Sequence, residues 1–187
     1  TSKFTARLRS RSLARASPTA AWSSVQVSGL STSQVVALVT ADVAALSSDN
    51  LKALNSSQIR VLDSSQIAAL TTYQVASLTT AGVSAVKDTQ LAVMETADIA
   101  ALSTAVIAKL TTAQLSAMTT AQVENLTTNQ LAVVTTAQIA VLTTDQLIGL
   151  SSTQAAALTT AQAAAIAAAD MALMETGDIA ALSSAVV

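Results

Sequence analysis

The chain has 187 residues, of which 51% are hydrophobic and 2% aromatic, with nine basic and 11 acidic residues. Its mean hydropathy of +0.54 would suit a membrane protein. However, the longest apolar run, Ala163 to Ala169, is far shorter than the roughly 18 residues of a transmembrane helix. The absence of Cys and His excludes disulfides and the usual zinc sites and removes the commonest general base.

Residues 1–22 are predicted to form a basic N-terminal arm. The arm holds five of the nine basic residues and no acidic residue, whereas the remainder of the chain has four basic residues against all 11 acidic ones. We interpret the arm either as a solvated tail or as an amphipathic basic helix that docks on the acidic remainder of a neighbouring copy. The candidate assembly residues of the arm are Lys3, Phe4, Arg7, Leu8, Arg9, Arg11, Arg15 and Trp22. Nucleic acid is not an expected partner, because the arginines lack interleaved aromatic residues and the acidic remainder would repel phosphate.

Residues 23–187 repeat with a period of eight. Steps of eight from Leu30 to Leu182 meet 20 apolar residues without an insertion or deletion. With this residue as position 8 of an octad, position 5 is also apolar, positions 1 and 2 are usually Ser or Thr, position 4 is usually Gln, and positions 6 and 7 are mostly Ala. Such a strict period is the signature of a repeat architecture.

The spacing within each octad favours a short helix. Positions 5 and 8 are three residues apart, which places them on one face of a helix but on opposite faces of a strand. Eight helical residues overshoot two full turns by about 80°, so the helix must break once per octad to keep one apolar stripe. Ser or Thr at position 1 with Gln at position 4 matches the capping box that starts a helix. The clearest pairs are Thr111 and Gln114, Thr119 and Gln122, Thr127 and Gln130, Thr135 and Gln138, and Thr143 and Gln146.

Five octads begin with a residue that caps a helix poorly, and in them we expect the position-2 residue to act as the N-cap. Their first residues are Val39, Lys87, Glu95, Ala167 and Glu175. Because helices this short are unstable alone in water, the octads must stack. We therefore predict an all-α solenoid over residues 23–187 with one very short capped helix per octad. A β-solenoid is the alternative, since Thr and Val favour strands, but the capping pattern and the presence of only four Gly argue against it.

The C-terminal residues Val186 and Val187 complete the set of candidate assembly residues. The array stops within an octad at an apolar end, where solenoids normally carry a polar cap. An end of this kind favours head-to-tail stacking on another copy, and such heterologous contacts generate filaments.

No catalytic residues can be grouped from the sequence. Ser and Thr are abundant, but there is no His to activate them and no Lys in a distinctive motif. Most carboxylates fall near expected helix N-termini, where a negative charge complements the helix dipole. We therefore expect no enzymatic activity, no cofactor and no bound metal.

The run from Leu110 to Ile166 resembles the long Leu-Thr-Thr-x-Gln repeat proteins of bacteria, which are described as surface adhesins or as heme-utilisation or adhesion proteins. This resemblance implies an extracellular or cell-surface location and a self-assembling fibre or adhesive role in cell aggregation and biofilm. The expected partners are further copies of the chain and cell or abiotic surfaces, with no membrane-spanning segment. Heme binding finds no support, because the usual axial ligands His and Cys are missing. The alternative function is a soluble solenoid that binds a protein partner, as a secreted effector or scaffold.

Overall fold

The computed structural model describes residues 18–186 of the chain. Within them every octad forms one short helix and no strand occurs. The fold is therefore an all-α solenoid, as predicted, and the β-solenoid alternative is wrong.

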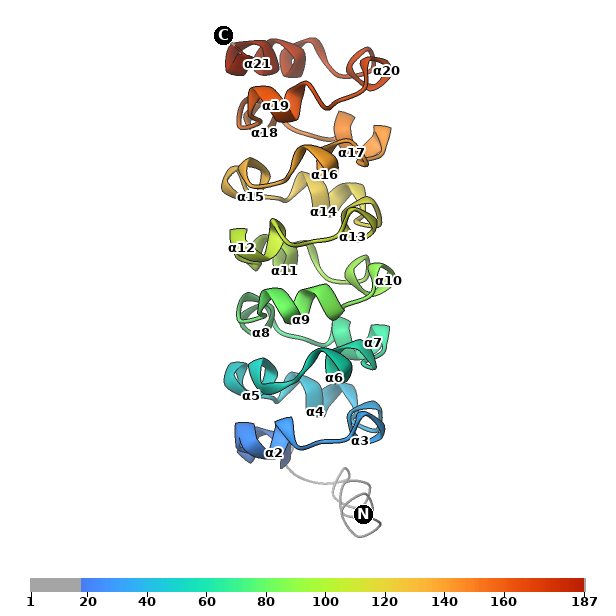
Figure 1. Cartoon of the computed structure of the whole chain (residues 1–187), viewed down its shortest axis with the longest axis vertical. Coiled ribbons are helices and arrows are strands. Elements are labelled where there is room, and N and C mark those ends of the chain that lie inside the picture. Colours follow the sequence, from blue (N-terminus) through green and yellow to red (C-terminus); the bar gives the residue numbers. More distant parts are fainter. Residues whose placement is uncertain (1–17, 187) are drawn as a thin grey trace.

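A short 3-10 helix precedes a regular series of α-helices (Figure 1). The elements are η1 (Pro18–Ala21), α2 (Ser24–Ser28), α3 (Thr32–Val36), α4 (Thr40–Ala44), α5 (Ser48–Ala53), α6 (Ser56–Arg60), α7 (Ser64–Ala68), α8 (Thr72–Ala76), α9 (Thr80–Ala85), α10 (Asp88–Leu91), α11 (Thr96–Ala101), α12 (Thr104–Ile107), α13 (Thr112–Ser116), α14 (Thr120–Glu124), α15 (Thr128–Ala132), α16 (Thr136–Ile139), α17 (Thr144–Ile148), α18 (Ser152–Ala156), α19 (Thr160–Ala163), α20 (Ala168–Met171) and α21 (Thr176–Val186). Most α-helices thus cover positions 2 to 6 of an octad.

Each helix packs on the helix three places further along the chain, so one turn of the solenoid takes three octads. The helices therefore form three columns: the α2 column (α2, α5, α8, α11, α14, α17, α20), the α3 column (α3, α6, α9, α12, α15, α18, α21) and the α4 column (α4, α7, α10, α13, α16, α19). Figure 1 shows α2, α5 and α8 above one another at the left and α20 of the same column at the upper right, so the columns wind around the long axis.

The apolar positions of the octad line the interior of this rod. Position-5 and position-8 side chains from Val27 to Leu182 form one buried apolar cluster, except that Ile179, at position 5 of the last octad, is 42% exposed. Ala155 and Ala163 remain buried where position 5 is small, while Met171 is half-buried against the cluster. Both apolar positions of the octad are therefore core positions, apart from position 5 of the last octad.

The chain turns each corner without glycine in a special conformation. Position-1 residues are extended, as at Thr127 (φ −69°, ψ 156°), and a position-8 residue such as Leu102 is extended too (φ −61°, ψ 138°). Two consecutive extended residues redirect the chain into the next helix. Among the described residues none has positive φ, which explains how a solenoid with so many corners manages with four Gly in the whole chain.

The expectation that position 2 caps the irregular octads is wrong for four of them. In α4, α10, α11 and α20 the extended N-cap residue is still at position 1, although its side chain makes no capping hydrogen bond. These N-cap residues are Val39, Lys87, Glu95 and Ala167. The helix start is therefore set by the packing of the octad in the solenoid, and a capping side chain only reinforces it.

Two elements depart from the regular octad. The element η1 packs against α4, where a helix three octads earlier would lie, and the Thr19 hydroxyl donates to the Asp42 carbonyl over 2.7 Å. The last helix, α21, has 11 residues and continues past the octad boundary at Leu182.

Candidate functional site

The predicted capping residues form the N-terminal hydrogen bonds of five consecutive helices, α13 to α17. In each pair the hydroxyl at position 1 accepts from the backbone N–H of Gln, and the Gln side chain accepts from the backbone N–H of position 1. For Thr127 and Gln130 these distances are 3.2 Å and 2.8 Å. The pairs are Thr111 and Gln114, Thr119 and Gln122, Thr127 and Gln130, Thr135 and Gln138, and Thr143 and Gln146.

The same glutamines have a second role that sequence reasoning missed. Gln130 is only 2% exposed, and its Nε2 donates to the carbonyls of Leu102 and Ile99 over 2.7 Å and 3.0 Å. The Leu102 carbonyl lies in the corner after α11, one turn below, where the helix offers no donor. The Ile99 carbonyl lies in α11 and also accepts from the backbone N–H of Leu102. One buried side chain thus starts its own helix and satisfies the end of another.

This contact recurs with a constant separation of 28 residues between each glutamine and a position-8 carbonyl. The distance is 2.5 to 2.8 Å in ten of the pairs, and Gln90 makes the same bond to Leu62. We call these residues the position-4 amide ladder: Gln58, Gln66, Gln74, Gln90, Gln114, Gln122, Gln130, Gln138, Gln146, Gln154 and Gln162.

The sequence did contain a signal for the ladder. A capping box accepts Glu or Gln at this position, yet no octad has Glu there. Only the amide can donate a hydrogen bond as well as accept one. The frequent use of Gln and the absence of Glu at this position therefore indicated that a donor was needed, although not which carbonyl it reaches. Asn50 serves in the same way, since its Nδ2 donates to the Trp22 carbonyl over 2.8 Å.

Five octads of the described region interrupt the ladder after it begins. Their position-4 residues are Gly82, Asp98, Val106, Asp170 and Asp178. Two of the aspartates instead accept from a hydroxyl on the helix below: Thr144 donates to Asp170 over 2.6 Å and Ser152 donates to Asp178 over 2.7 Å. An ionised carboxylate cannot donate to a carbonyl, and neither Gly nor Val offers a side-chain donor. The ends of α5, α7, α8, α16 and α17 thus lack the amide contact.

Most of the predicted assembly residues lie outside the described part of the chain. These are Lys3, Phe4, Arg7, Leu8, Arg9, Arg11, Arg15 and Val187. Val186 lies in α21. Trp22 is half-buried and packs against the core cluster, so this residue serves the first turn of the solenoid.

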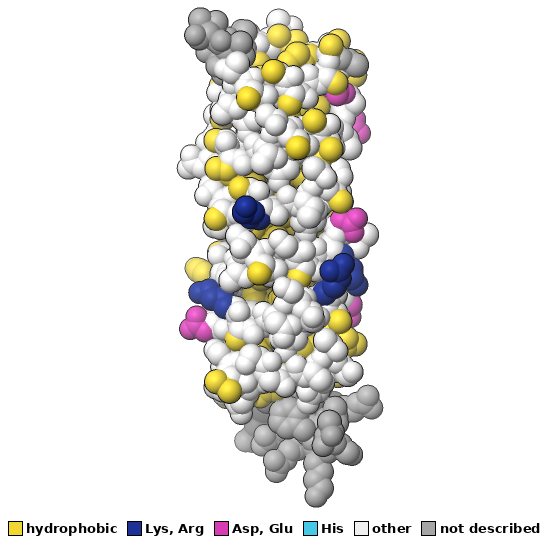
Figure 2. All heavy atoms as spheres, in the orientation of Figure 1, with side chains coloured by type: hydrophobic (Ala, Val, Ile, Leu, Met, Phe, Trp, Pro, Cys, Tyr) yellow, Lys and Arg dark blue, Asp and Glu magenta, His cyan; other side chains and the backbone are white. Residues whose placement is uncertain are grey.

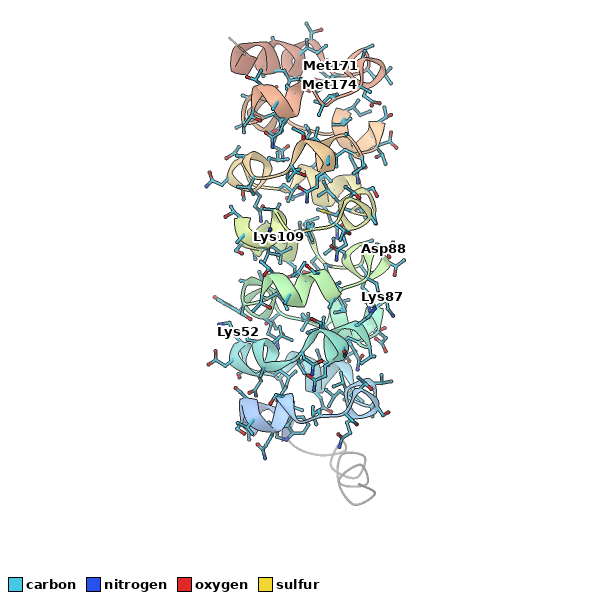
Figure 3. The ribbon with its side chains drawn as sticks, viewed as in Figure 1. Lys52, Lys87, Asp88, Lys109, Met171 and Met174 are labelled. Atoms are coloured by element: carbon cyan, nitrogen blue, oxygen red, sulfur yellow. The ribbon has the colours of Figure 1, made fainter. Side chains whose placement is uncertain are left out.

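Most charged side chains of the described residues lie on the outside of the rod, spread over several columns, whereas Asp98 and Asp178 are buried. Figure 3 shows Lys52 on α5, Lys87 and Asp88 at the start of α10, and Lys109 after α12, all separate from Met174 in the core. Lys52 and Asp49 form the one ion pair found in residues 18–186, at 3.7 Å. Within the same residues no group of three or more His, Cys, Asp or Glu is placed to hold a metal ion. No helix in this range combines the length and apolar character needed to cross a bilayer.

Two stretches of the chain match a known protein family. Residues 43–80 and 91–128 match the model of the ALTTAQ repeat, and both stretches begin at position 5 of an octad, at Val43 and Leu91. No curated protein and no solved structure matches the chain. The chain is therefore a repeat protein, a helical solenoid whose octads are similar to the ALTTAQ repeat.

Proposed function

We propose that this chain is a structural, non-catalytic segment of a self-assembling fibre or adhesin on the outside of a bacterial cell. The observation that carries the proposal is the position-4 amide ladder. Its buried amides hold one turn of the solenoid to the next with the same contact in eleven octads, so octads add length without changing the local structure. Stability in such arrays is a sum of repeat and neighbour terms, which suits a long rod.

The location and the adhesive role follow from the resemblance to bacterial Leu-Thr-Thr-x-Gln repeat proteins, and the match to the ALTTAQ repeat supports the repeat character of the chain.

The location is tested on intact cells of the source bacterium. Brief treatment with an external protease should remove the antibody signal for this chain while a cytoplasmic marker stays intact. Full protection of the chain would contradict an outside location.

Self-assembly is tested by negative-stain electron microscopy of the purified chain at about 0.15 M salt, where surface charge is moderately screened. We expect filaments of constant width. Deleting residues 1–17 should reduce filament number, because it removes the basic arm and leaves η1 and Trp22 in place. The matched control replaces the arm with an equally long Gly-Ser segment. Monomers under all conditions would contradict self-assembly, and unchanged filaments from the deletion would exclude the arm as a docking element.

A second candidate function, binding of a protein partner, is favoured by the uneven surface. All four basic residues of the array lie between Lys52 and Lys109, and Tyr73, in the same region, is 87% exposed. Tyr and Arg are enriched in binding hot spots, and this region holds both Tyr73 and Arg60. A chain that stays monomeric, and that cross-links from position 73 to one partner whose binding is lost in Tyr73→Ala, would establish this function instead.

A further inference from the structure

Two octads carry a carboxylate at both the first and the fourth position of the capping box. Glu95 precedes Asp98 in the octad of α11, and Glu175 precedes Asp178 in the octad of α21, whereas every other octad has at most one acidic residue at these positions. Acidic side chains are few and spread along the visible face of the rod (Figure 2), so two of them in one capping box are unusual. The amide ladder does not explain the pair, because a carboxylate has no hydrogen to donate.

The side chains at positions 1 and 4 of an octad lie next to each other. In the octad of α15 the Thr127 hydroxyl is 3.1 Å from Oε1 of Gln130, because the two ends of a capping box face one another. In the octad of α11 the same positions hold Glu95, which is extended like other N-cap residues, and Asp98. Neighbouring like charges are unfavourable on a helix. Neither carboxylate forms an ion pair in residues 18–186, so the described part of the chain does not supply the opposite charge.

Asp98 is buried without a hydrogen-bond partner for its carboxylate. The residue is only 2% exposed, and its carboxylate accepts no hydrogen bond from the described residues. Asp178, in contrast, accepts from the Ser152 hydroxyl over 2.7 Å. A buried charge is costly unless it is paired or coordinates a metal. Asp98 therefore needs a positively charged ligand.

Backbone carbonyls from one turn below converge on the amide nitrogens of the ladder. For Nε2 of Gln130 they belong to residues 28, 30 and 31 positions earlier, at 2.7, 3.2 and 3.0 Å. The same separations lead from Asp98 to the carbonyls of Leu70, Ala68 and Ile67. None of these three carbonyls accepts from a side chain of the described residues. The end of α7 thus presents a group of carbonyl oxygens toward the place of the missing amide.

The side chain of an aspartate is long enough to reach this place. Asn50 has the same length and stands at position 4 of its octad, and its Nδ2 lies 2.8 Å from the Trp22 carbonyl oxygen 28 residues earlier. When a carboxylate oxygen replaces that nitrogen, as at Asp98, two acceptors face each other with no hydrogen between them. A metal cation bound to both oxygens removes this conflict.

We propose that Glu95, Asp98 and the carbonyls of Leu70, Ala68 and Ile67 bind one Ca²⁺ ion. Ca²⁺ takes about six to eight oxygen ligands, carboxylates and backbone carbonyls among them, and tolerates irregular geometry. Glu95 is exposed, so its side of the site is open to the ion and to water ligands. The expectation of no bound metal considered side chains alone, whereas three of these ligands are backbone carbonyls. The inference does not depend on self-assembly, since all the ligands lie in one chain.

Terbium luminescence tests the site on the purified chain. Tb³⁺ accepts the same oxygen ligands as Ca²⁺ and emits when a nearby excited tyrosine transfers energy to it. Tyr73 lies in α8, which packs directly on α11. We expect emission that saturates with Tb³⁺ and is lost in Tyr73→Phe. Ca²⁺ should displace Tb³⁺ with a dissociation constant of about 0.1 to 1 mM, the range of extracellular calcium modules.

The decisive variant is Asp98→Asn, which keeps the size of the side chain and can donate to the Leu70 carbonyl as Asn50 does to Trp22. It should keep the helical circular dichroism spectrum and lower the affinity for Tb³⁺ at least about tenfold. Asp49→Asn is the matched control, because Asp49 lies in α5, which packs on the opposite side of α8. This control should bind Tb³⁺ like the unmodified chain. Equal affinity of D98N and the unmodified chain would overturn the proposal, as would a loss of emission in D49N alone.

Hydrogen exchange separates a built site from loose binding to surface carboxylates. Ca²⁺ at about 5 mM, above the expected dissociation constant, should slow exchange in the peptide around the corner at Leu70, because a bound ion makes that corner harder to open. Mg²⁺ should have a smaller effect, since it requires near-ideal octahedral geometry. Neither ion should change this peptide in D98N. Equal protection by both ions in both chains would show surface binding only and would overturn the site.

Discussion

At the scale of single residues, the glutamine at position 4 explains more of this structure than any other side chain. Its Oε1 accepts from the start of its own octad and its Nε2 donates to the end of another, as Gln130 does for Thr127 and Leu102. A buried polar group that lacks its partner costs about 1 to 3 kcal/mol. One buried amide side chain therefore supplies hydrogen bonds to the backbone of two chain segments, which lets a chain with many corners bury its polar groups.

Replacing Gln130 by Glu should destabilise the chain by about 2 to 4 kcal/mol, because a carboxylate would face the carbonyls of Leu102 and Ile99 without a proton to donate. Urea unfolding followed by circular dichroism measures the effect. Gln34→Glu is the matched control. Gln34 makes the same capping contact, with Ser31, but it is only half-buried, so its replacement should change stability by less than about 0.5 kcal/mol. Equal effects in the two variants would contradict the donor role.

Replacing Gly82 by Gln should stabilise the chain by about 1 to 2 kcal/mol, through higher helix propensity and a new donor to the Leu54 carbonyl. The position accepts a side chain, since an added Cβ would meet its nearest neighbour, the Thr79 hydroxyl, at an ordinary 3.4 Å. Gly82→Ala separates the two contributions, because it supplies the propensity without the donor. A thermal melt in which G82Q is no more stable than G82A would show that the amide contact contributes nothing there.

At the scale of elements, helices of four to six residues persist because they pack in the solenoid and because side chains bind both ends of most of them. Nucleation makes such helices unfavourable in isolation. In the solenoid the N-terminal amides bind the position-1 hydroxyl, and the C-terminal carbonyls bind the amide of a later octad. The octads without a capping side chain, such as those starting at Val39 and Ala167, still begin their helices at the same position.

Removal of one capping side chain tests how much the capping hydrogen bond contributes to the stability of the chain. Thr127→Ala should lower stability by about 1 kcal/mol, because the Gln130 amide loses its acceptor. Thr128→Ala, one residue later inside the exposed first turn, should be neutral or slightly stabilising because Ala is the better helix former. Denaturation midpoints of the two variants provide the comparison. A larger loss from Thr128→Ala would contradict the capping assignment.

Hydrogen exchange should reveal the interruptions in the amide ladder. The ends of α7 and α8 lack a donor, since Asp98 and Val106 stand where Gln would reach them, whereas α12 and α13 are held by Gln138 and Gln146. Local openings are easier where fewer contacts are broken. We expect peptides covering α7 and α8 to exchange faster than those covering α12 and α13 by mass spectrometry. Uniform protection along the rod would show that the ladder does not control local stability.

At the scale of the whole molecule, the solenoid is quasi-one-dimensional, because each helix packs on partners three octads away along either direction. Its core is continuous from Val27 to Leu182. Charge, in contrast, is not uniform: charged residues are frequent from Asp42 to Lys109, whereas only Glu124 and Asp145 are charged between Leu110 and Ile166. The repeat therefore determines a regular interior, while the outer positions are free to differ along the rod.

Duplication of residues 111–134, which make three octads and hence one turn, should lengthen the rod by about 9 Å with no loss of thermal stability, because neighbour contacts add up in such arrays. Small-angle X-ray scattering measures the length, and circular dichroism should show a proportional gain in helix. A scrambled insert of the same composition is the control and should lower the melting temperature. A duplicated chain that melts like the scrambled one would contradict the interchangeability of octads.

The sequence alone determined the local structure of this protein. The eight-residue period located every helix, the pairing of Thr127 with Gln130 located a helix start, and the apolar positions 5 and 8 identified the core. These features depend on residues three or four apart, so the local sequence pattern is enough to predict them. The basic arm and the ends of the chain yielded hypotheses about assembly, which the proposed experiments address.

Only the tertiary structure decided how the octads are arranged. Three features depend on contacts between residues more than 20 positions apart. They are the three octads per turn, the hydrogen bond from Gln130 to Leu102, and the helix start at Val39. Every octad has nearly the same sequence, so the pattern does not distinguish a partner three octads away from one two or four octads away. Packing of the apolar core and hydrogen bonding of the buried carbonyls select among these arrangements. Both exist only when a full turn of the solenoid has formed.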